Sequence, residues 1–280
     1  MQIQLNQVGY FYSGIKIKYI ALEDINLKIM AEDEFIAIIG HTGSGKSTLV
    51  QLMNALLIPT SGTANIFGQQ LPPKRRDKIN HLRQEVGLVF QFPEYQLFEE
   101  TVLKDIMFGP KNFKNTAKDA EARAKIAAEM VGLDETILFE SPFRISGGQM
   151  RRVAIAGILA MDPKVLVLDE PTRGLDPKGR DEIMKIFQNI HNETHKSIVL
   201  ITHDMDLVSK YAKRVIVLEN GKIKFDGKKE DLFHHPNFKD FNLELPTPLK
   251  ILRHLEADIN LPYVAKYDYD SLVEYLKGIK

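Results

Sequence analysis

The chain has 280 residues, 44% of them hydrophobic, which is enough for one large domain with a small appendage. Its 37 basic and 37 acidic residues give a formal net charge of zero, which argues against a nucleic-acid partner held mainly through phosphate contacts. The absence of cysteine excludes disulfides and thiolate chemistry and favours a reducing compartment. No secretory signal pattern or membrane-spanning apolar run is visible, so we expect any membrane link to run through a partner.

Strand-like and helix-like segments alternate along most of the chain. Residues 2–8 and 21–30 look like strands with no helix between them, which predicts a small antiparallel sheet. Short β-branched runs then read as buried strands, and segments of helical periodicity follow them. The expected strands are 35–39, 86–90, 165–168 and 198–201, and the expected helices are 46–56, 149–160, 178–191 and 205–211. This alternation predicts an α/β fold with a mainly parallel core sheet.

Two regions depart from the alternation. Between residues 92 and 145 no strong strand appears, and 101–108 and 116–131 read as helices, so we expect a helical subdomain at about 92–160. After residue 227 the pattern loosens, prolines recur, and amphipathic helices are expected near 249–257 and 271–276. The predicted division is therefore a main domain at 1–227 and a small C-terminal helical domain at 228–280.

A complete phosphate-binding loop, Gly-His-Thr-Gly-Ser-Gly-Lys-Ser at 40–47, follows one expected strand and opens a helix. The glycines let the backbone wrap around phosphates, the lysine reaches the β- and γ-phosphates, and the hydroxyl of Ser47 is suited to ligate Mg²⁺. ATP with Mg²⁺ is the expected ligand. The expected ATP-binding residues of this segment are Gly40, His41, Thr42, Gly43, Ser44, Gly45, Lys46, Ser47 and Thr48.

Polar side chains stand at the carboxyl ends of three expected parallel strands, where ligands of such sheets bind. Asp169 is suited to hold Mg²⁺, and Glu170 to polarise an attacking water, although both could instead cap the turn that follows. His203 could stabilise the γ-phosphate or merely form a hydrogen bond. Gln91 could touch the metal or the water. Beside the phosphate-binding loop we expect Glu170, His203 and Gln91 to act in catalysis.

A second anion-binding segment, Ser146-Gly147-Gly148-Gln149, opens another helix with a hydroxyl, bare backbone N–H groups and the positive end of the helix dipole. Two half-sites on one chain predict that each finds its other half on a partner chain, so we expect a dimer. We call residues 146–149 the signature segment.

In this order these motifs resemble the ATP-binding cassette ATPases of ABC transporters, from residue 2 to about 227. The resemblance implies a P-loop NTPase fold of ABC type and head-to-tail dimers in which each ATP lies between one phosphate-binding loop and the opposite signature segment. It also implies a D-loop at Asp176, magnesium ligands at Ser47, Gln91 and Asp169, and Tyr12 stacked on adenine, with Tyr10 as the nearest rival. Arg173 departs from the family pattern, since a small residue is commoner before the D-loop; it could alter communication at the dimer seam or simply face solvent.

The segment at 91–102, Gln-Phe-Pro-Glu-Tyr-Gln-Leu-Phe-Glu-Glu-Thr-Val, looks like the second ATPase subunit of energy-coupling-factor transporters. That resemblance implies a subunit that hydrolyses ATP to drive uptake of vitamins or transition-metal ions, placed peripherally on the cytoplasmic face of the cell membrane. It implies as partners a second ATPase subunit, a transmembrane coupling protein and a substrate-binding membrane subunit, with the C-terminal domain helping the two ATPases dimerise. The sequence leaves three points open. These are the transported substrate, whether the dimer is a homodimer or a heterodimer, and whether both ATP sites shared between the two chains are active.

Three other classes compete with this interpretation. One is the ATPase of a conventional importer for cobalt, nickel or an amino acid. The others are a soluble cassette protein outside transport and a regulatory subunit without catalysis. Two further features have simple explanations: Arg151 and Arg152 are expected on a solvated helix face, and His191 and His195, spaced i, i+4, lack the neighbours that a zinc site needs.

Overall fold

Two β-sheets frame the structure, a computed structural model that describes residues 2–13, 18–259 and 261–279. The larger sheet has six strands in the order β10-β9-β3-β8-β7-β6, and the smaller has four in the order β2-β1-β4-β5. The strands are β1 (Gln2–Ser13), β2 (Lys18–Met30), β3 (Phe35–Ile39), β4 (Ser61–Ile66), β5 (Gln69–Leu71), β6 (Val86–Val89), β7 (Val165–Asp169), β8 (Ser197–Ile201), β9 (Arg214–Glu219) and β10 (Lys222–Lys228).

The core of the larger sheet is parallel, as the sequence predicts. Strands β6, β7, β8, β3 and β9 pair in parallel, and β10 closes one edge as an antiparallel hairpin with β9. Every residue of β3 and β8 is buried, because helices or the second sheet cover both faces. The carboxyl ends of β3, β7 and β8 therefore lie side by side at one edge.

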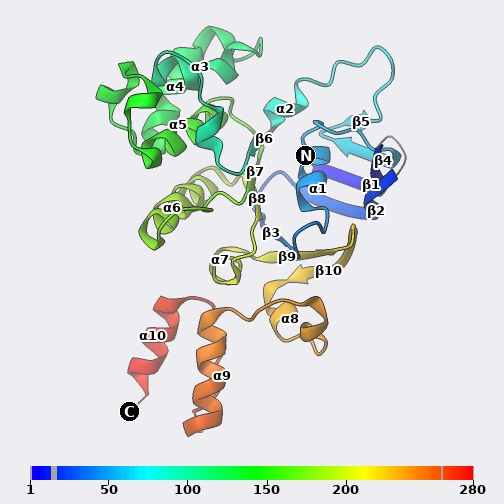
Figure 1. Ribbon diagram of the computed structural model, residues 1–280, viewed down its shortest axis with the longest axis vertical. Coiled ribbons are helices and arrows are strands. Elements are labelled where there is room, and N and C mark those ends of the chain that lie inside the picture. Colours follow the sequence, from blue (N-terminus) through cyan, green and yellow to red (C-terminus); the bar gives the residue numbers. More distant parts are fainter. Residues whose placement is uncertain (1, 14–17, 260, 280) are drawn as a thin grey trace.

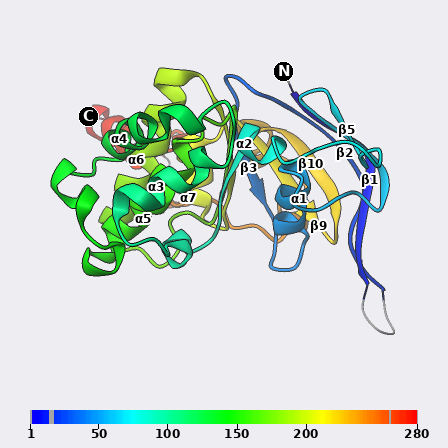
Figure 2. The ribbon, with the colours of Figure 1, turned by 90° about the horizontal axis from the view of Figure 1, so that it is seen from above.

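Helices and the smaller sheet cover the larger sheet from opposite sides (Figure 2). The antiparallel sheet predicted from the N-terminal segments is confirmed, and its buried residues share a hydrophobic cluster with α1 and one face of the larger sheet. The helical segment shares the cluster on the other face. The α-helices are α1 (Lys46–Met53), α2 (Leu82–Glu85), α3 (Val102–Lys111), α4 (Ala120–Met130), α5 (Gly147–Leu159), α6 (Pro177–Thr194), α7 (Met205–Tyr211), α8 (Lys229–Phe233), α9 (Thr247–Ile259) and α10 (Tyr269–Gly278).

The region between β6 and β7 is helical, in line with the sequence prediction. Its longer helices α3, α4 and α5 pack on one another, and short 3₁₀ turns connect them. The single helix expected at 116–131 is shorter: α4 begins only at Ala120, after a 3₁₀ turn at Ala117–Asp119. Thr116 explains the break, because its hydroxyl donates to the carbonyl of Pro110 at 2.7 Å instead of leaving the segment to α-helical pairing.

Helices α8, α9 and α10 form a C-terminal appendage below the sheets, at the end opposite to α3 and α4 (Figure 1). The appendage is not a separate core. Phe233 of α8 and Leu249 of α9 share one buried cluster with residues of β3, α7 and β9. The division expected between residues 227 and 228 falls within the last residues of β10.

Candidate functional site

The phosphate-binding loop joins β3 to α1 and requires glycine at two of its positions. Gly40 has φ 147°, and a Cβ built on it would stand 2.0 Å from the carbonyl oxygen of Leu218. Gly45 has φ 103°, and its Cβ would stand 2.6 Å from the carbonyl oxygen of Ala21. Any side chain at these positions would push the loop away from the sheet. The loop is thus shaped by its neighbours before any phosphate binds.

Lys46 lies folded inside this loop. Its Nζ donates to the carbonyl oxygens of Gly40 at 2.7 Å and His41 at 2.9 Å. Burial lowers the pKa of Lys46, while the nearby carboxylates of Glu170 and Asp169 act in the opposite direction. The ammonium is therefore a partly desolvated cation, and phosphate oxygens would compensate it better than these carbonyls do.

A cavity of about 280 Å³ brings together residues predicted as the metal and phosphate site. It is lined by Lys46, Ser47, Gln91, Asp169 and Glu170 among others, contributed by α1 and by the ends of β6 and β7. Burial raises the pKa of Asp169, and a hydrogen bond with Ser47 partly offsets this. Hydroxyl, amide and carboxylate oxygens are the hard donors that Mg²⁺ prefers, so this set fits a magnesium ion completed by substrate phosphates and water.

A second cavity, of about 670 Å³, lies on the histidine side of the same loop. Glu170 and His203 both line it, and His203 Nδ1 lies 2.8 Å from Glu170 Oε1. The sequence placed both residues at strand ends but did not predict this contact. Glu170 also has a φ of 51°, an unusual backbone conformation for a residue other than glycine, and its N–H donates to Ile201 O at 3.0 Å. The carboxylate is thereby aimed at the histidine across the sheet edge.

Two tyrosines of the smaller sheet, Tyr12 and Tyr19, lie near this site. Tyr12 is 41% exposed, its hydroxyl lies 3.2 Å from that of Thr48, and its ring meets Tyr10 edge-on at 4.9 Å. Tyr10 packs against the buried cluster instead, which leaves Tyr12 as the ring with an open face. Tyr19 also lines the metal-side cavity, and sequence reasoning missed it. Only its pairing with Tyr12 across the β1–β2 hairpin brings it there.

The signature segment begins α5 with a reciprocal capping box. Ser146 Oγ accepts from Gln149 N at 3.3 Å, and Gln149 Oε1 accepts from Ser146 N at 2.9 Å. A Cβ on Gly147 or Gly148 would meet no atom within 4 Å. Within the described part of the chain, no residue of this segment lines either cavity, so the signature segment and the phosphate-binding loop do not form one site within the chain. Asp176 is the N-cap of α6 and accepts from Gly179 N at 3.1 Å.

The expectation of a solvated face at Arg151 is wrong. Arg151 is only 3% exposed and forms two hydrogen bonds with Glu94, at 2.7 and 2.9 Å. It also donates to the carbonyl oxygens of Pro171 and Arg173. Arg152 pairs with Glu182 at 2.8 Å. Periodicity alone could not show this, because the partners come from other elements.

The two histidines spaced i, i+4 make separate contacts. His191 Nδ1 lies 2.9 Å from Lys196 O, and His195 Nδ1 lies 2.9 Å from Asp33 Oδ1. Among the residues described, no group of three or more His, Cys, Asp or Glu side chains could hold a metal ion. A magnesium ion at the phosphate-binding loop would therefore depend on hydroxyl, amide and phosphate oxygens as well as Asp169.

Known proteins resemble this chain over most of its length. The family model described as ABC transporter matches residues 22–173, and a second model, described as AAA domain, putative AbiEii toxin, Type IV TA system, matches 139–209. The energy-coupling factor transporter ATP-binding protein EcfA2 of Ligilactobacillus salivarius is 52% identical over 88% of this chain and 86% of its own length. The EcfA2 of Enterococcus faecalis is 50% identical over 99% of this chain and 98% of its own length.

Solved structures show the same fold. The structure of cbiO1 from Clostridium perfringens, part of the ABC transporter complex cbiONQ, aligns with a TM-score of 0.74 at 34% identity and covers 92% of this chain and 95% of its own. A dimeric post-hydrolysis state of the ATP-binding cassette MJ0796, bound to ADP and Pi, aligns with a TM-score of 0.71 at 30% identity over 81% of this chain and 98% of its own. The chain therefore belongs to the ABC transporter ATPases and, within them, to the energy-coupling factor transporter ATP-binding proteins.

Proposed function

We propose that this chain is the ATP-hydrolysing subunit of an energy-coupling factor membrane transporter and drives the uptake of vitamins or transition-metal ions. The contact between Glu170 and His203 carries the proposal, because it stands in a cavity that Lys46 also lines. An acid, a histidine and a phosphate-binding lysine around one cavity are the groups that ATP hydrolysis requires. The similarity to EcfA2 proteins over nearly the whole chain supports the transport role.

In this proposal the backbone of the phosphate-binding loop and Lys46 hold the β- and γ-phosphates, and Tyr12 stacks on adenine. Glu170 orients the attacking water and accepts its proton, while His203 supports that carboxylate and contacts the γ-phosphate. Ser47, Asp169 and Gln91 would hold Mg²⁺, which when bound neutralises charge on the phosphate oxygens. The proton of the attacking water thus moves to the carboxylate of Glu170, which already contacts His203.

The signature segment, together with Asp176 of the D-loop, would complete the ATP site of a partner ATPase. Support comes from its open glycines and its absence from the cavities of its own chain. Closure of the dimer on ATP and its reopening after hydrolysis would move the attached membrane subunits. The proposed partners are a second ATPase subunit, a transmembrane coupling protein and a substrate-binding membrane subunit.

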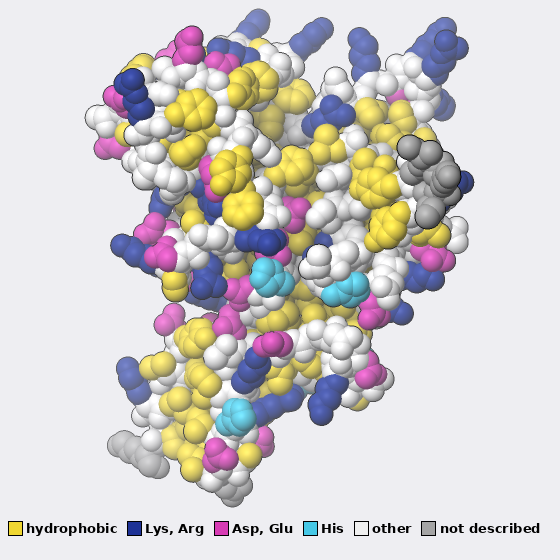
Figure 3. Space-filling model, in the orientation of Figure 1, with side chains coloured by type: hydrophobic (Ala, Val, Ile, Leu, Met, Phe, Trp, Pro, Cys, Tyr) yellow, Lys and Arg dark blue, Asp and Glu magenta, His cyan; other side chains and the backbone are white. Residues whose placement is uncertain are grey.

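We place the chain at the cytoplasmic face of the cell membrane through these partners. None of the helices within residues 2–13, 18–259 and 261–279 is both long and apolar enough to cross a bilayer. Exposed aromatic side chains on the helical segment, Phe98, Phe108, Phe139 and Phe143, suit a protein partner. Figure 3 shows hydrophobic side chains gathered on the surface of that part of the molecule.

The Glu170→Gln variant tests the proposed chemistry. We expect it to bind ATP as the wild type does but to hydrolyse it at least about a hundredfold more slowly, because the amide cannot accept the proton. Phosphate release from the transporter complex and ATP binding by calorimetry are the two measurements. Glu193→Gln, an exposed change on α6, serves as the matched control. Wild-type turnover in Glu170→Gln would refute the assigned role.

A second candidate is the ATPase of a conventional ABC importer, because the ABC transporter family model and the similarity to cbiO1, part of the ABC transporter complex cbiONQ, do not depend on the kind of membrane partner. Both candidates share the ATP site and differ only in the membrane partner. Affinity purification of the tagged chain from its own membranes, followed by mass spectrometry of the co-purified subunits, separates them. A coupling protein shared by several substrate-binding subunits supports the first candidate, and a dedicated permease supports the second.

A further inference from the structure

Arg173 stands at the boundary between the two cavities of the site. Four residues line both cavities, namely Thr42, Lys46, Glu170 and Arg173. On one side lie the expected magnesium ligands, and on the other lies His203. The guanidinium therefore faces the place where phosphates and metal are expected, although the chemistry proposed above does not use it.

The side chain of Arg173 binds Gln91. When the amide of Gln91 is oriented with its oxygen toward the guanidinium, that oxygen accepts from Arg173 Nη1 at 2.7 Å and from Nε at 3.0 Å. The opposite orientation would set amide N–H donors against guanidinium N–H donors, so the first orientation is the correct one. An amide oxygen has two lone pairs, and these two donors use both.

Arg173 is held in this position by its own backbone. Its N–H donates to Glu170 O at 3.1 Å, and its carbonyl accepts from the buried Arg151 at 3.0 Å. The guanidinium also lies 6.0 Å from the centre of the Phe92 ring, next to Gln91 in sequence. These contacts fix the exposed Arg173 between Glu170, the proposed catalytic base, and Gln91, the expected metal ligand.

We propose that Arg173 is a positioning residue that holds the side-chain oxygen of Gln91 away from magnesium until Mg²⁺-ATP binds. The inference rests on the proposed function, in which this oxygen ligates the metal. Gln91 cannot give its lone pairs to a cation while two guanidinium donors occupy them. Once released, Arg173 stays at the wall of the phosphate cavity, where phosphate charge attracts it.

Magnesium titrations test the proposal without turnover. In the Glu170→Gln chain, calorimetry would give the ATP affinity over a series of Mg²⁺ concentrations and in EDTA. We expect Arg173→Ala to lower the Mg²⁺ concentration for half-maximal ATP binding by roughly tenfold, because the two charge-assisted hydrogen bonds to Gln91 no longer have to be broken. Arg173→Lys should lie between, since an ammonium can donate to the Gln91 oxygen but lacks the two-donor fork. Binding in EDTA should not tighten in either variant.

A double-mutant cycle with Gln91→Ala decides whether Arg173 acts through Gln91. In the Gln91→Ala background, Arg173→Ala should leave the magnesium requirement unchanged. Exposed Arg76, outside both cavities, provides the matched control Arg76→Ala. Thermal unfolding of each variant checks that it folds.

Three results would overturn the proposal. The first two are an unchanged or raised magnesium requirement for ATP binding in Arg173→Ala or in Arg173→Lys. The third is a magnesium requirement that Arg173→Ala still lowers in the Gln91→Ala background. A failure of the proposed function looks different. In that case the Glu170→Gln chain, without any change at Arg173, would bind ATP equally well with Mg²⁺ and in EDTA.

Discussion

At the scale of single residues, the pair of Arg151 and Glu94 joins three parts of the site. Arg151 belongs to the helix that the signature segment opens, and Glu94 follows Gln91 by three positions. The same guanidinium donates to Pro171 O and Arg173 O, in the loop that follows Glu170. One buried cation thus connects the signature helix, the Gln91 segment and the Glu170 loop. A shift of any of them must strain the other two.

Removing one member of this pair should destabilise the fold. Side-chain exposure is 4% for Arg151 and 15% for Glu94, so Glu94→Gln leaves a buried charge without its counterion. We expect a loss of about 3 kcal/mol in the free energy of unfolding, measured by urea denaturation. The exposed pair of Lys104 and Glu100 gives the control, and Glu100→Gln should not change the midpoint measurably. An unchanged midpoint in Glu94→Gln would contradict this account.

The residue types of the site could be predicted from sequence, but their contacts could not. A glycine-rich loop before a helix and an acid at a strand end are local patterns whose chemistry follows from adjacent residues. Glu94 and Arg151 lie 57 positions apart, and Gln91 and Arg173 also meet only in the folded chain. Tyr19 was missed for the same reason, since the hairpin alone brings it to the cavity.

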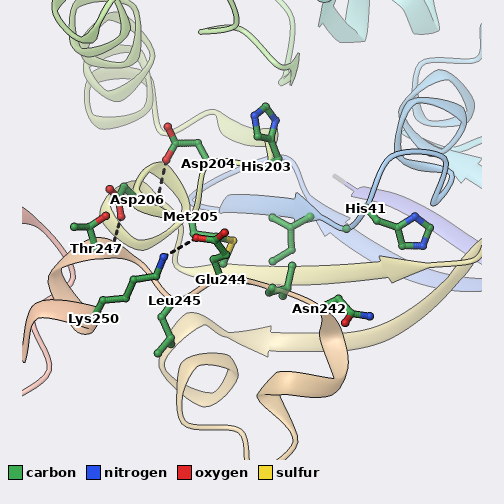
Figure 4. A pocket seen from close by; sticks show the side chains of 13 residues that line it. His41, His203, Asp204, Met205, Asp206, Asn242, Glu244, Leu245, Thr247 and Lys250 are labelled. Carbon is green, nitrogen blue, oxygen red and sulfur yellow. Dashed lines mark hydrogen bonds and ion pairs between the residues drawn. The ribbon is translucent and has the colours of Figure 1, made fainter. Parts of the chain in front are cut away.

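At the scale of elements, the short helix α7 links His203 to the C-terminal appendage. It begins directly after His203, with Asp204 as its N-cap, and Asp204 also pairs with Arg180 of α6. Asp206, in the first turn, accepts from the backbone N–H of Thr247 at 2.6 Å and from the hydroxyl of Tyr269 at 3.1 Å. Figure 4 shows Asp206 pointing toward Thr247 beside a cavity of about 430 Å³ that His203 also lines. The appendage is therefore attached next to His203, the proposed catalytic histidine.

Asp206→Ala should loosen α9 and α10 while the sheets stay intact. Two hydrogen bonds are lost, so we expect amide hydrogen exchange in both helices to speed up by about tenfold, measured by mass spectrometry. Asp258→Ala, an exposed change on α9, is the control and should leave exchange unchanged. If α9 and α10 exchanged at the wild-type rate in Asp206→Ala, the attachment would depend on the apolar cluster around Phe233 and Leu249 alone.

Most strands and helices with a regular pattern were predicted, but β9 was missed although its four central residues are buried, and so were two strands with a polar or edge pattern. The all-apolar β3 and β8 stand where the sequence predicts them. Strand β10 was missed because it lies at an edge, and its charged residues alternate with half-buried ones. Strand β4, Ser-Gly-Thr-Ala-Asn-Ile, is short and rich in residues that disfavour strands, so only its pairing with β1 forms it.

At the scale of the whole molecule, the two anion-binding segments of the chain lie apart. The phosphate-binding loop lies at the edge of the larger sheet, whereas the signature segment opens a helix of the helical segment and contributes to neither cavity. In the proposed function, a second ATPase brings its signature segment over the phosphate-binding loop. The open surface at Gly147 and Gly148 would accept a phosphate group without rearrangement of the chain.

Ser146→Arg should disrupt the signature segment and leave the phosphate-binding loop of the same chain intact. It removes the N-cap of α5, adds a cation at the positive end of the helix dipole, and places a bulky side chain where the partner would dock. ATP binding to the chain's own phosphate-binding loop should stay within about twofold of wild type, because that loop is formed by other residues. Asn115→Arg places the same side chain on an exposed turn of the helical segment and serves as the control.

Trapped ATP in the purified transporter complex gives the decisive measurement. In complexes whose ATPase subunits all carry the glutamate-to-glutamine change, which is Glu170→Gln in this chain, the ATP retained after gel filtration counts the closed composite sites. If the partner is a second copy of this chain, Ser146→Arg damages both sites and should abolish retention. If the partner is a different ATPase, the change damages only the site built on the partner's loop, and one ATP should remain with this chain. Full retention would contradict a site shared between chains, because nothing else in the described chain brings the signature segment to its own phosphate-binding loop.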